Sequence, residues 1–159
     1  MRRGGSRVLM PGAPFAQVAR SALAGDQWNG AQHPLVAGPL RLSLAQYREL
    51  EAFAQFGSEL DQATLRQLAR GQRVVEVLKQ PQYQPMGVAE QTEVIFAVTN
   101  GLLDDVPVAG IRAWEDGFHQ FMAASHPEMA EEIRTKKAIS DDLAARLRQA
   151  IETYRALHK

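Results

Sequence analysis

Two histidines and a glutamate are the first residues whose types and spacing could carry out chemistry. His119 and His126 are seven residues apart and could share one face of a helix, and Glu115 precedes His119 by one turn. Such groups can bind a metal ion, but the spacing dictates no further ligand of the kind that a stable site needs. We interpret both as surface histidines and predict no metal site.

Two pairs of adjacent aspartates, Asp104–Asp105 and Asp141–Asp142, could act as paired carboxylates. Adjacent residues on a helix do not face one another, so neither pair is expected to form a catalytic dyad. We interpret the first pair as a loop before a helix. The second pair follows Ser140, which can cap a helix whose first turn favours acidic side chains.

The third candidate is the segment Leu78–Pro85, with the sequence LKQPQYQP. Its two prolines end a helical stretch, because a proline disfavours helix in the residue before it. Between them lie uncharged amides, Gln80 and Gln82 among them, and no acid, base, thiol or pair of hydroxyls. What these amides do at the end of a helix is the question that this segment raises.

Motifs for other chemistries are absent from the 159 residues. The sequence has no phosphate-binding GxxxxGK[ST] loop and no HExxH, GxSxG or GxGxxG motif. It has no cysteine, which excludes disulfides, zinc–thiolate sites and cysteine nucleophiles. No apolar run approaches the roughly 18 residues that span a bilayer, so we expect no transmembrane segment.

The charge is zero overall but unevenly placed. Residues 1–42 carry five arginines and one aspartate, so the remainder is mildly acidic. An acidic body is a poor surface for nucleic acid, and we predict no nucleic-acid partner. A length of 159 residues with 45% hydrophobic residues fits one globular domain.

The elements that position these residues are expected to be helices. Ser43 and Asp61 are expected to cap helices that end near Phe56 and Gln80, and a third is expected over Val88–Leu103. Pro127 is expected to begin a short helix that ends near Thr135. Four apolar stripes at helical spacing predict the core: Leu65, Leu68, Val75 and Leu78; Val88, Ile95, Val98 and Leu102; Ile111, Trp114, Phe118, Phe121 and Met122; Leu143, Leu147, Ile151 and Tyr154. The fold class is therefore all-α, a compact bundle of about six helices.

The first 37 residues contain frequent glycine and proline, and no helical or alternating period survives there. We expect an irregular or disordered N-terminal segment with at most a short helical turn. Four arginines and no acid in the first 25 residues also fit a mitochondrial transit peptide. A poorly specified leader is the preferred interpretation, because glycine and proline disfavour an amphipathic helix.

The segment Val36–Asp61, VAGPLRLSLAQYRELEAFAQFGSELD, is similar to a known family. It resembles the C-terminal helical domain of the alpha subunit of rotary proton-translocating (F-type) ATP synthases. The hallmark LAQYRE…AFAQFGS.LD of that family is matched by Leu44–Glu49 and Ala52–Asp61. Further matches follow in order at Arg70–Met86, Glu90–Leu103 and Glu132–Leu143. The resemblance covers residues 38–159 as one domain and leaves residues 1–37 unmatched.

The resemblance implies an answer for the glutamine segment. In the family, the two glutamines that match Gln80 and Gln82 lie beside the adenine of bound ATP or ADP. A carboxamide offers both a donor and an acceptor, which suits the amino group and ring nitrogen of adenine. Pro81 departs from the family pattern and could preset or shift this turn. The alternative is that the glutamines only solvate a helix end.

The same resemblance implies a role without catalysis for this protein. The family's P-loop, arginine finger and magnesium ligands have no counterpart in these residues, so we expect no ATP turnover by the protein itself. The implied function is that of a truncated ATP synthase alpha subunit, a regulatory and structural part of the catalytic ring in proton-driven ATP synthesis. The implied partners are the beta and gamma subunits.

The implied location is peripheral to a membrane through the complex. We expect the cytoplasmic side of a bacterial plasma membrane, with the matrix side of the mitochondrial inner membrane as the second choice. Two alternatives to an inherited subunit stay open: a free-standing helical adaptor that binds the ATP synthase ring, and a non-functional gene fragment. A truncated or frame-shifted gene would explain the unmatched leader.

Overall fold

The chain forms six α-helices and one short 3-10 helix within the residues that the computed structural model describes, 37–56, 59–79, 86–136 and 138–158. No strand occurs in those ranges, which confirms the all-α prediction. The predicted irregular segment lies outside the described residues up to position 36. The elements are α2 (Ala37–Gln55), α3 (Gln62–Val77), α4 (Val88–Thr99), η1 (Val108–Gly110), α5 (Ile111–Ser125), α6 (Pro127–Lys136) and α7 (Asp141–Leu157).

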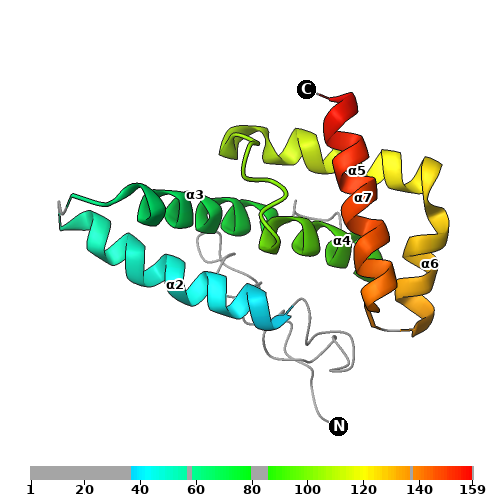
Figure 1. Ribbon diagram of the computed structural model, residues 1–159, viewed down its shortest axis with the longest axis horizontal. Helices are drawn as coiled ribbons and strands as arrows, with labels where there is room; N and C mark the ends of the chain where they lie inside the picture. The colour runs from blue at the N-terminus through cyan, green and yellow to red at the C-terminus, as the bar shows by residue number, and fades with distance from the viewer. Residues whose placement is uncertain (1–36, 57–58, 80–85, 137, 159) are drawn as a thin grey trace, which may run out of the picture.

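The helices are arranged as a hairpin that projects from a bundle (Figure 1). α2 and α3 pack side by side and form the α2–α3 hairpin. α4 contacts both hairpin helices and also α6 and α7, so it joins the hairpin to the rest of the bundle. α5, α6 and α7 lie at the end opposite the tip of the hairpin.

α2 begins earlier than the sequence predicts. Ser43 was expected to be a cap, but α2 starts at Ala37 and Ser43 lies inside it. A proline is well tolerated in the first turn of a helix, so Pro39 does not prevent this start. Leu40 and Leu44 are four residues apart and both buried, so packing of the extra turn stabilises it.

α4 is shorter than predicted: it ends at Thr99, whereas the predicted end was Leu103. Gly101 follows with a φ of 73°, in the left-handed region that glycine adopts without steric cost. The chain turns there, and Leu102 and Leu103 are nevertheless buried. The predicted core residue Leu102 therefore reaches the core from a turn.

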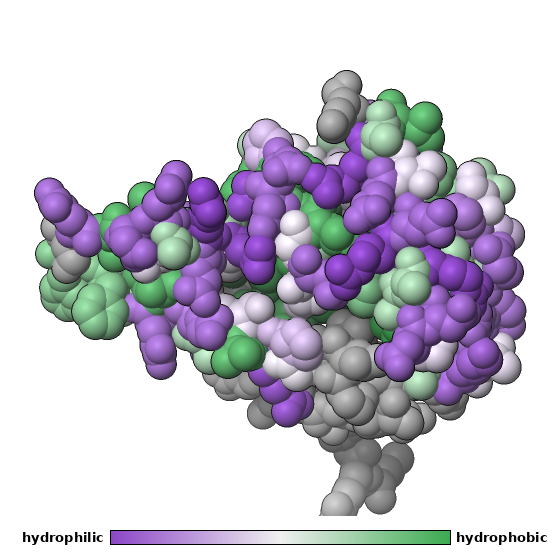
Figure 2. All heavy atoms as spheres, viewed as in Figure 1, coloured by the Kyte–Doolittle hydropathy of each residue, from purple (hydrophilic) through white to green (hydrophobic). Residues whose placement is uncertain are grey.

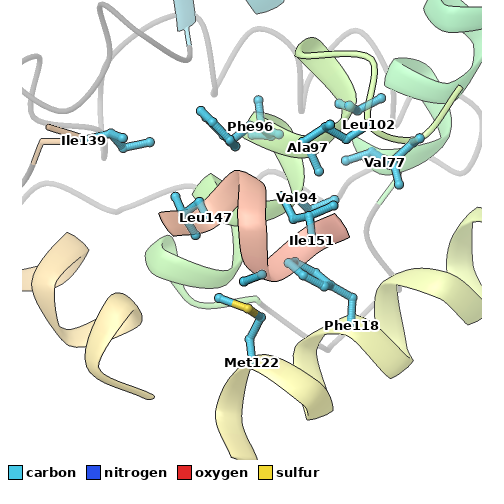
Figure 3. Close-up of a cluster of buried hydrophobic side chains, with 14 of the residues drawn as sticks. Val77, Val94, Phe96, Ala97, Leu102, Phe118, Met122, Ile139, Leu147 and Ile151 are labelled. Carbon is cyan, nitrogen blue, oxygen red and sulfur yellow. The ribbon is translucent and has the colours of Figure 1, made fainter. Parts of the chain in front are cut away.

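The core lies where α3, α4, α5 and α7 meet. Figure 3 shows Val94 and Ala97 of α4 near Ile151 of α7, with Phe118 and Met122 of α5 facing the same cluster. The predicted stripe of α7 is confirmed, since all four of its residues are buried: Leu143, Leu147, Ile151 and Tyr154. At about 25 cal/mol per Å² of apolar surface, burial of this kind is the main force that holds the bundle together.

Two residues predicted in buried stripes are exposed. Leu65 is 49% exposed and Val88 is 40% exposed. Leu65 lies near the start of α3, where the projecting hairpin offers few neighbours besides α2. Val88 is the first residue of α4 and lies at the edge of the core. The helical period predicts a face, but tertiary packing decides how far along a helix that face is covered.

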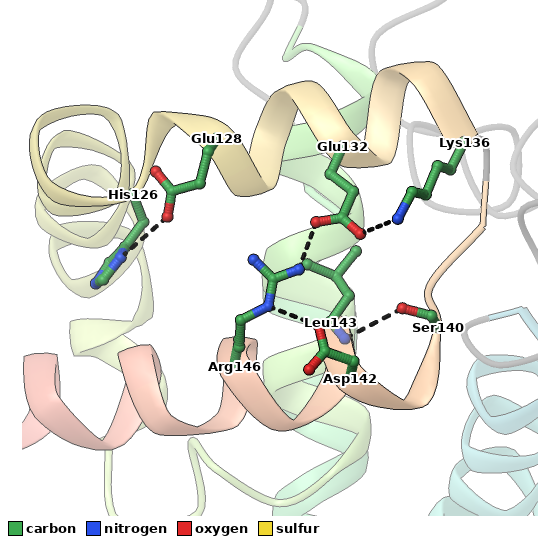
Figure 4. A network of polar contacts seen from close by, with 8 residues as sticks. All are labelled: His126, Glu128, Glu132, Lys136, Ser140, Asp142, Leu143 and Arg146. Atoms are coloured by element: carbon green, nitrogen blue, oxygen red, sulfur yellow. Dashed lines mark hydrogen bonds and ion pairs between the residues drawn. The ribbon is translucent and has the colours of Figure 1, made fainter.

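Polar contacts join α6 to α7 across their connection (Figure 4). Glu132 of α6 pairs with Arg146 of α7 and also with Lys136, whose Nζ lies 2.6 Å from Glu132 Oε1. The prediction that Ser140 caps α7 is confirmed: its Oγ accepts a hydrogen bond of 3.2 Å from the Leu143 amide. Asp61 occupies the predicted cap of α3, and its carboxylate accepts a hydrogen bond from the Thr64 hydroxyl. It makes no cap hydrogen bond of standard geometry, although the Thr64 hydroxyl and then the nearby amides of Thr64 and Ala63 lower its pKa.

Candidate functional site

The segment between α3 and α4 is the candidate functional site, and Gln80 and Gln82 lie outside the described residues. The structure describes the two residues that border the segment, Lys79 on one side and Met86 on the other. The described side chains show how the backbone is fixed at these two borders.

Arg112 of α5 fixes the border at Lys79. Its Nη2 donates a hydrogen bond of 2.9 Å to the Lys79 carbonyl oxygen, and its Nε lies 3.6 Å from Glu76 Oε1. Glu76 in turn accepts from Lys79 Nζ at 2.6 Å. One arginine and one glutamate thus bind both the backbone and the side chain of the residue before Gln80.

Gln91 fixes the border at Met86. Its Nε2 donates a hydrogen bond of 2.8 Å to the Met86 carbonyl oxygen. Gln91 lies in the first turns of α4, a helix whose following residues are continuously buried from Thr92 to Val98. The backbone that leads into α4 is therefore anchored at Met86 to α4 itself, the most buried helix of the described part.

Glu115 of α5 is a buried carboxyl near Arg112, the residue that fixes the border at Lys79. Burial raises its pKa to about 7, the nearby Arg112 charge acts in the opposite direction, and Asp116 and Glu76 raise it further. A carboxyl that titrates near neutrality can be a proton donor in catalysis or a structural feature of a core. The charged groups that act on Glu115 are Arg112, Asp116 and Glu76, and this arrangement by itself does not assign a reaction to it.

The aspartates of the first pair act separately. Asp104 pairs with Arg70 of α3, whose Nε donates to Asp104 Oδ1 at 3.0 Å, and Asp105 pairs with Arg155 of α7. Both aspartates lie in the turns that follow α4, ahead of a helix as predicted. The two carboxylates attach this connection to two different helices, α3 and α7, and do not form a dyad.

The second aspartate pair occupies the first turn of α7, as predicted. Asp142 Oδ2 lies 3.0 Å from Arg146 Nε, one turn along the same helix (Figure 4). Both aspartates are exposed. Their arrangement fits a favourable interaction with the helix dipole and not a site for chemistry.

The two histidines are half-buried, so the interpretation of them as surface residues holds only in part. His119 Nε2 lies 3.3 Å from the Glu90 carbonyl oxygen, and burial lowers the pKa of His119. His126 Nδ1 lies 3.5 Å from Glu128 Oε1, and its ring packs edge-on against Phe121. No group of three or more potential ligands in the described ranges could hold a metal ion. The helical period places both histidines beside a core, which the sequence interpretation overlooked.

The aromatic stripe of α5 is part of the core, as predicted. Trp114 stacks on Phe118 with ring centroids 4.7 Å apart and an interplanar angle of 18°. Tyr154 of α7 approaches both rings edge-on. These contacts bury the ring faces that a stacking platform for a base would need, so the stripe stabilises the α5–α7 contact.

The sequence analysis missed Glu93 in α4, which is the most buried acidic residue among those described, at 1% exposure. Its pKa is raised to about 7, mainly by burial and then by the charge of Glu90. A signal was present, because Ala89, Phe96 and Ala97 follow a buried helical period in which Glu93 occupies a core position. The fold must therefore accommodate an acidic side chain inside its core.

A comparison with family models places this arrangement among known proteins. Residues 33–154 match the model of the family described as ATP synthase alpha/beta chain, C terminal domain. The match covers about three quarters of the sequence and contains α2 to α6 and most of α7. The described residues contain no helix that is long and apolar enough to cross a membrane.

Proposed function

The protein belongs to the family of C-terminal domains of ATP synthase alpha and beta chains, and from this premise we propose that it is an alpha-type domain in the catalytic ring of an F-type ATP synthase. The alpha assignment is supported by the motifs at Leu44–Glu49, Ala52–Asp61 and Arg70–Met86. The first motif lies on α2, the second begins on α2 and ends at Asp61 before α3, and the third begins on α3.

The observation that carries the proposal is the anchoring of both borders of the glutamine segment. Arg112 holds the Lys79 carbonyl oxygen and Gln91 holds the Met86 carbonyl oxygen, so both borders of the segment are tied to the bundle. Fixed borders lower the entropic cost of ordering the residues between them when a ligand binds. Gln80 and Gln82 are the residues that we propose to contact the adenine of ATP or ADP.

The proposed contribution to the ring is structural and regulatory. The 159 residues contain no phosphate-binding loop, and phosphoryl transfer needs a phosphate cradle and a magnesium ion. We therefore expect the purified protein to show no ATP turnover above that of a buffer blank. Any turnover that survives re-purification and rises with protein concentration contradicts this expectation.

The proposed contact surface for the beta and gamma subunits is the tip of the α2–α3 hairpin. Phe53 is 63% exposed and Phe56 is 83% exposed, and Leu42 and Leu65 add further exposed apolar surface along the hairpin. Figure 2 shows apolar surface at the projecting end of the molecule. Exposed aromatic side chains of this kind are typical of interaction sites. Such contacts would hold the protein peripheral to a membrane, by preference on the cytoplasmic side of a bacterial plasma membrane.

Site-directed cross-linking tests the proposal, because the sequence has no cysteine of its own. A cysteine placed at the exposed Glu59 (Glu59→Cys), beside the hairpin tip, carries a photoreactive group into native membranes. We expect adducts with the beta or gamma subunit, detected by specific antibodies. Adducts with the alpha subunit alone, or none, contradict the alpha assignment.

A pair of variants separates specific contact from adhesion. Phe53→Ser with Phe56→Ser is expected to abolish the adducts, whereas Leu157→Ser is expected to leave them, because Leu157 is also apolar and exposed but lies at the end of α7 and not on the hairpin. Equal loss in both variants would mean that the adducts arise from general hydrophobic adhesion.

A further inference from the structure

The last turn of α3 carries an acidic side chain, Glu76, at a place where a helix favours cations. The Glu76 side chain is only 19% exposed, and each of its oxygens lies near a cation. Lys79 Nζ lies 2.6 Å from Oε2, and Arg112 Nε lies 3.6 Å from Oε1. Arg112 belongs to the first turn of α5, so Glu76 connects the end of α3 to a second helix.

Arg112 also holds a backbone group at this end of α3. Its Nη2 donates a hydrogen bond of 2.9 Å to the Lys79 carbonyl oxygen, while its Nε faces Glu76. Lys79 is the residue after the C-cap Leu78, and cationic side chains commonly donate to carbonyl groups at this end of a helix. The guanidinium is a planar fork of donors, so its contact with Glu76 orients the donor that reaches Lys79.

A hydrogen bond to the Lys79 carbonyl oxygen orients a whole peptide unit. This carbonyl belongs to the peptide unit that joins Lys79 to Gln80, and the atoms of a peptide unit lie close to one plane. At the other border, Gln91 holds the Met86 carbonyl oxygen, which belongs to the peptide unit that leads on into α4. Of these two border contacts, the one made by Arg112 therefore acts on the peptide unit that enters the glutamines.

We propose that Arg112, oriented by Glu76, is a positioning residue for the adenine contact and that it raises the selectivity for adenine over guanine. The inference rests on the proposed function, in which Gln80 and Gln82 contact the base. Adenine and guanine present different donors and acceptors, so selectivity depends on where the amides are held. A peptide unit that is already oriented loses less conformational freedom when the base binds.

The ratio of ATP to GTP affinity in an assembled ring that carries the full-length protein tests this role. Arg112→Gln is expected to lower the ratio by about threefold to tenfold, the cost of ordering one or two additional groups. Arg112→Lys keeps a cation and a donor and is expected to restore part of the ratio. Arg146→Gln removes ion pairs to α6 and within α7 and is expected to leave the ratio unchanged. A merely structural role lowers both affinities together, so a wild-type ratio in Arg112→Gln overturns the inference.

Variants of the glutamines separate a failure of this inference from a failure of the proposed function. Gln80→Ala with Gln82→Ala is expected to lower the ratio, and adding Arg112→Gln is expected to lower it no further. If the glutamine pair lowers the ratio and Arg112→Gln alone does not, the inference fails and the proposed function stands. If the glutamine pair has no effect, the proposed function fails and the inference fails with it.

Two further outcomes complete the test. A further loss when Arg112→Gln is added to the glutamine pair means that Arg112 acts by another route, and this result also overturns the inference. Arg112 is 44% exposed, so its replacement is expected to leave the fold intact. If its variants do not assemble, Glu76→Gln decides the matter, because it releases the guanidinium and is expected to lower the ratio in the same direction. A wild-type ratio in Glu76→Gln then counts against the inference.

Discussion

The hydroxyl oxygen of Tyr154 in α7 lies 3.5 Å from the carbonyl oxygen of Trp114 in α5, and it fills the space beside Gly117. A Cβ atom at residue 117 would overlap that hydroxyl oxygen, while the next ring atom, Tyr154 Cζ, would lie at an ordinary 3.5 Å. Residue 117, in the middle of α5, therefore has no room for a larger side chain, because Tyr154 of α7 reaches across it. The two helices approach this closely at that point only with a hydrogen atom as the side chain.

The first prediction follows from this contact. Gly117→Ala is expected to lower the free energy of unfolding by about 1–3 kcal/mol, because overpacking outweighs the better helix propensity of alanine. In a Tyr154→Phe background the obstructing hydroxyl is gone, and the same alanine is expected to be neutral or stabilising. Urea unfolding of the two single variants and the double variant measures the coupling. An alanine that is equally harmful in both backgrounds contradicts the assigned contact.

Stability is expected to fall as the pH rises from about 5 to 8. Burial raises the pKa of Glu93 and of Glu115 to about 7, above the value of 4.5 that applies to an exposed glutamate. The folded state therefore holds more protons than the unfolded state between these values. The stability from neutral Glu93 and Glu115 is fully present below pH 4.5 and is lost as the pH rises through 7. Glu93 alone accounts for a loss on the order of 2–3 kcal/mol.

At low pH a different group limits stability. Hydrogen bonds from Lys136 and Arg146 lower the pKa of Glu132, so its contribution is lost as the pH falls through that lowered value. The optimum is thus expected in mildly acidic solution, measured by thermal unfolding at a series of pH values. Glu93→Gln with Glu115→Gln is expected to flatten the alkaline side and to leave the acid side unchanged. A wild-type profile that keeps rising to pH 8 contradicts the buried neutral carboxyls.

The two helix caps are expected to differ in strength. Ser140 accepts a hydrogen bond from the Leu143 amide, so Ser140→Ala is expected to lower the free energy of unfolding by about 1 kcal/mol. Asp61 makes no cap hydrogen bond of standard geometry, although the Thr64 hydroxyl and then the nearby amides of Thr64 and Ala63 lower its pKa, so Asp61→Ala is expected to cost less. Ser140→Asp keeps an acceptor and is expected to restore stability, which urea unfolding can show. Equal losses at the two positions would contradict the difference in cap geometry.

Much of the fold could be predicted from local patterns, because the apolar stripes of α5 and α7 repeat at the helical period. The stripe from Ile111 and the stripe from Leu143 both identify buried faces. Tertiary contacts escaped prediction. The start of α2 at Ala37 depends on the burial of Leu40, and the exposure of Leu65 depends on how far the hairpin projects.

The candidate site was predictable only in part for the same reason. The sequence and the family resemblance point to Gln80 and Gln82. The arginine that anchors the residue before them, Arg112, is 33 positions away from Lys79 in the sequence. Glu93 was detectable as an acid at a core position, but Arg134, whose charge acts against the effect of its burial, lies on another helix. Spacing within one helix identifies a face, whereas contacts between helices require the packed structure.

The last prediction concerns the adenine contact. In an assembled ring that carries this domain, Gln80→Ala and Gln82→Ala are each expected to weaken adenine nucleotide binding by up to about tenfold, the loss of one or two hydrogen bonds. Gln84→Ala, in the same segment but without a match to the contact residues, is the control and is expected to change nothing. The readout is the ratio of ATP to GTP affinity, since a general loss of folding lowers both affinities while the loss of an adenine contact lowers their ratio. If all three variants keep the wild-type ratio, the glutamines only solvate the end of α3.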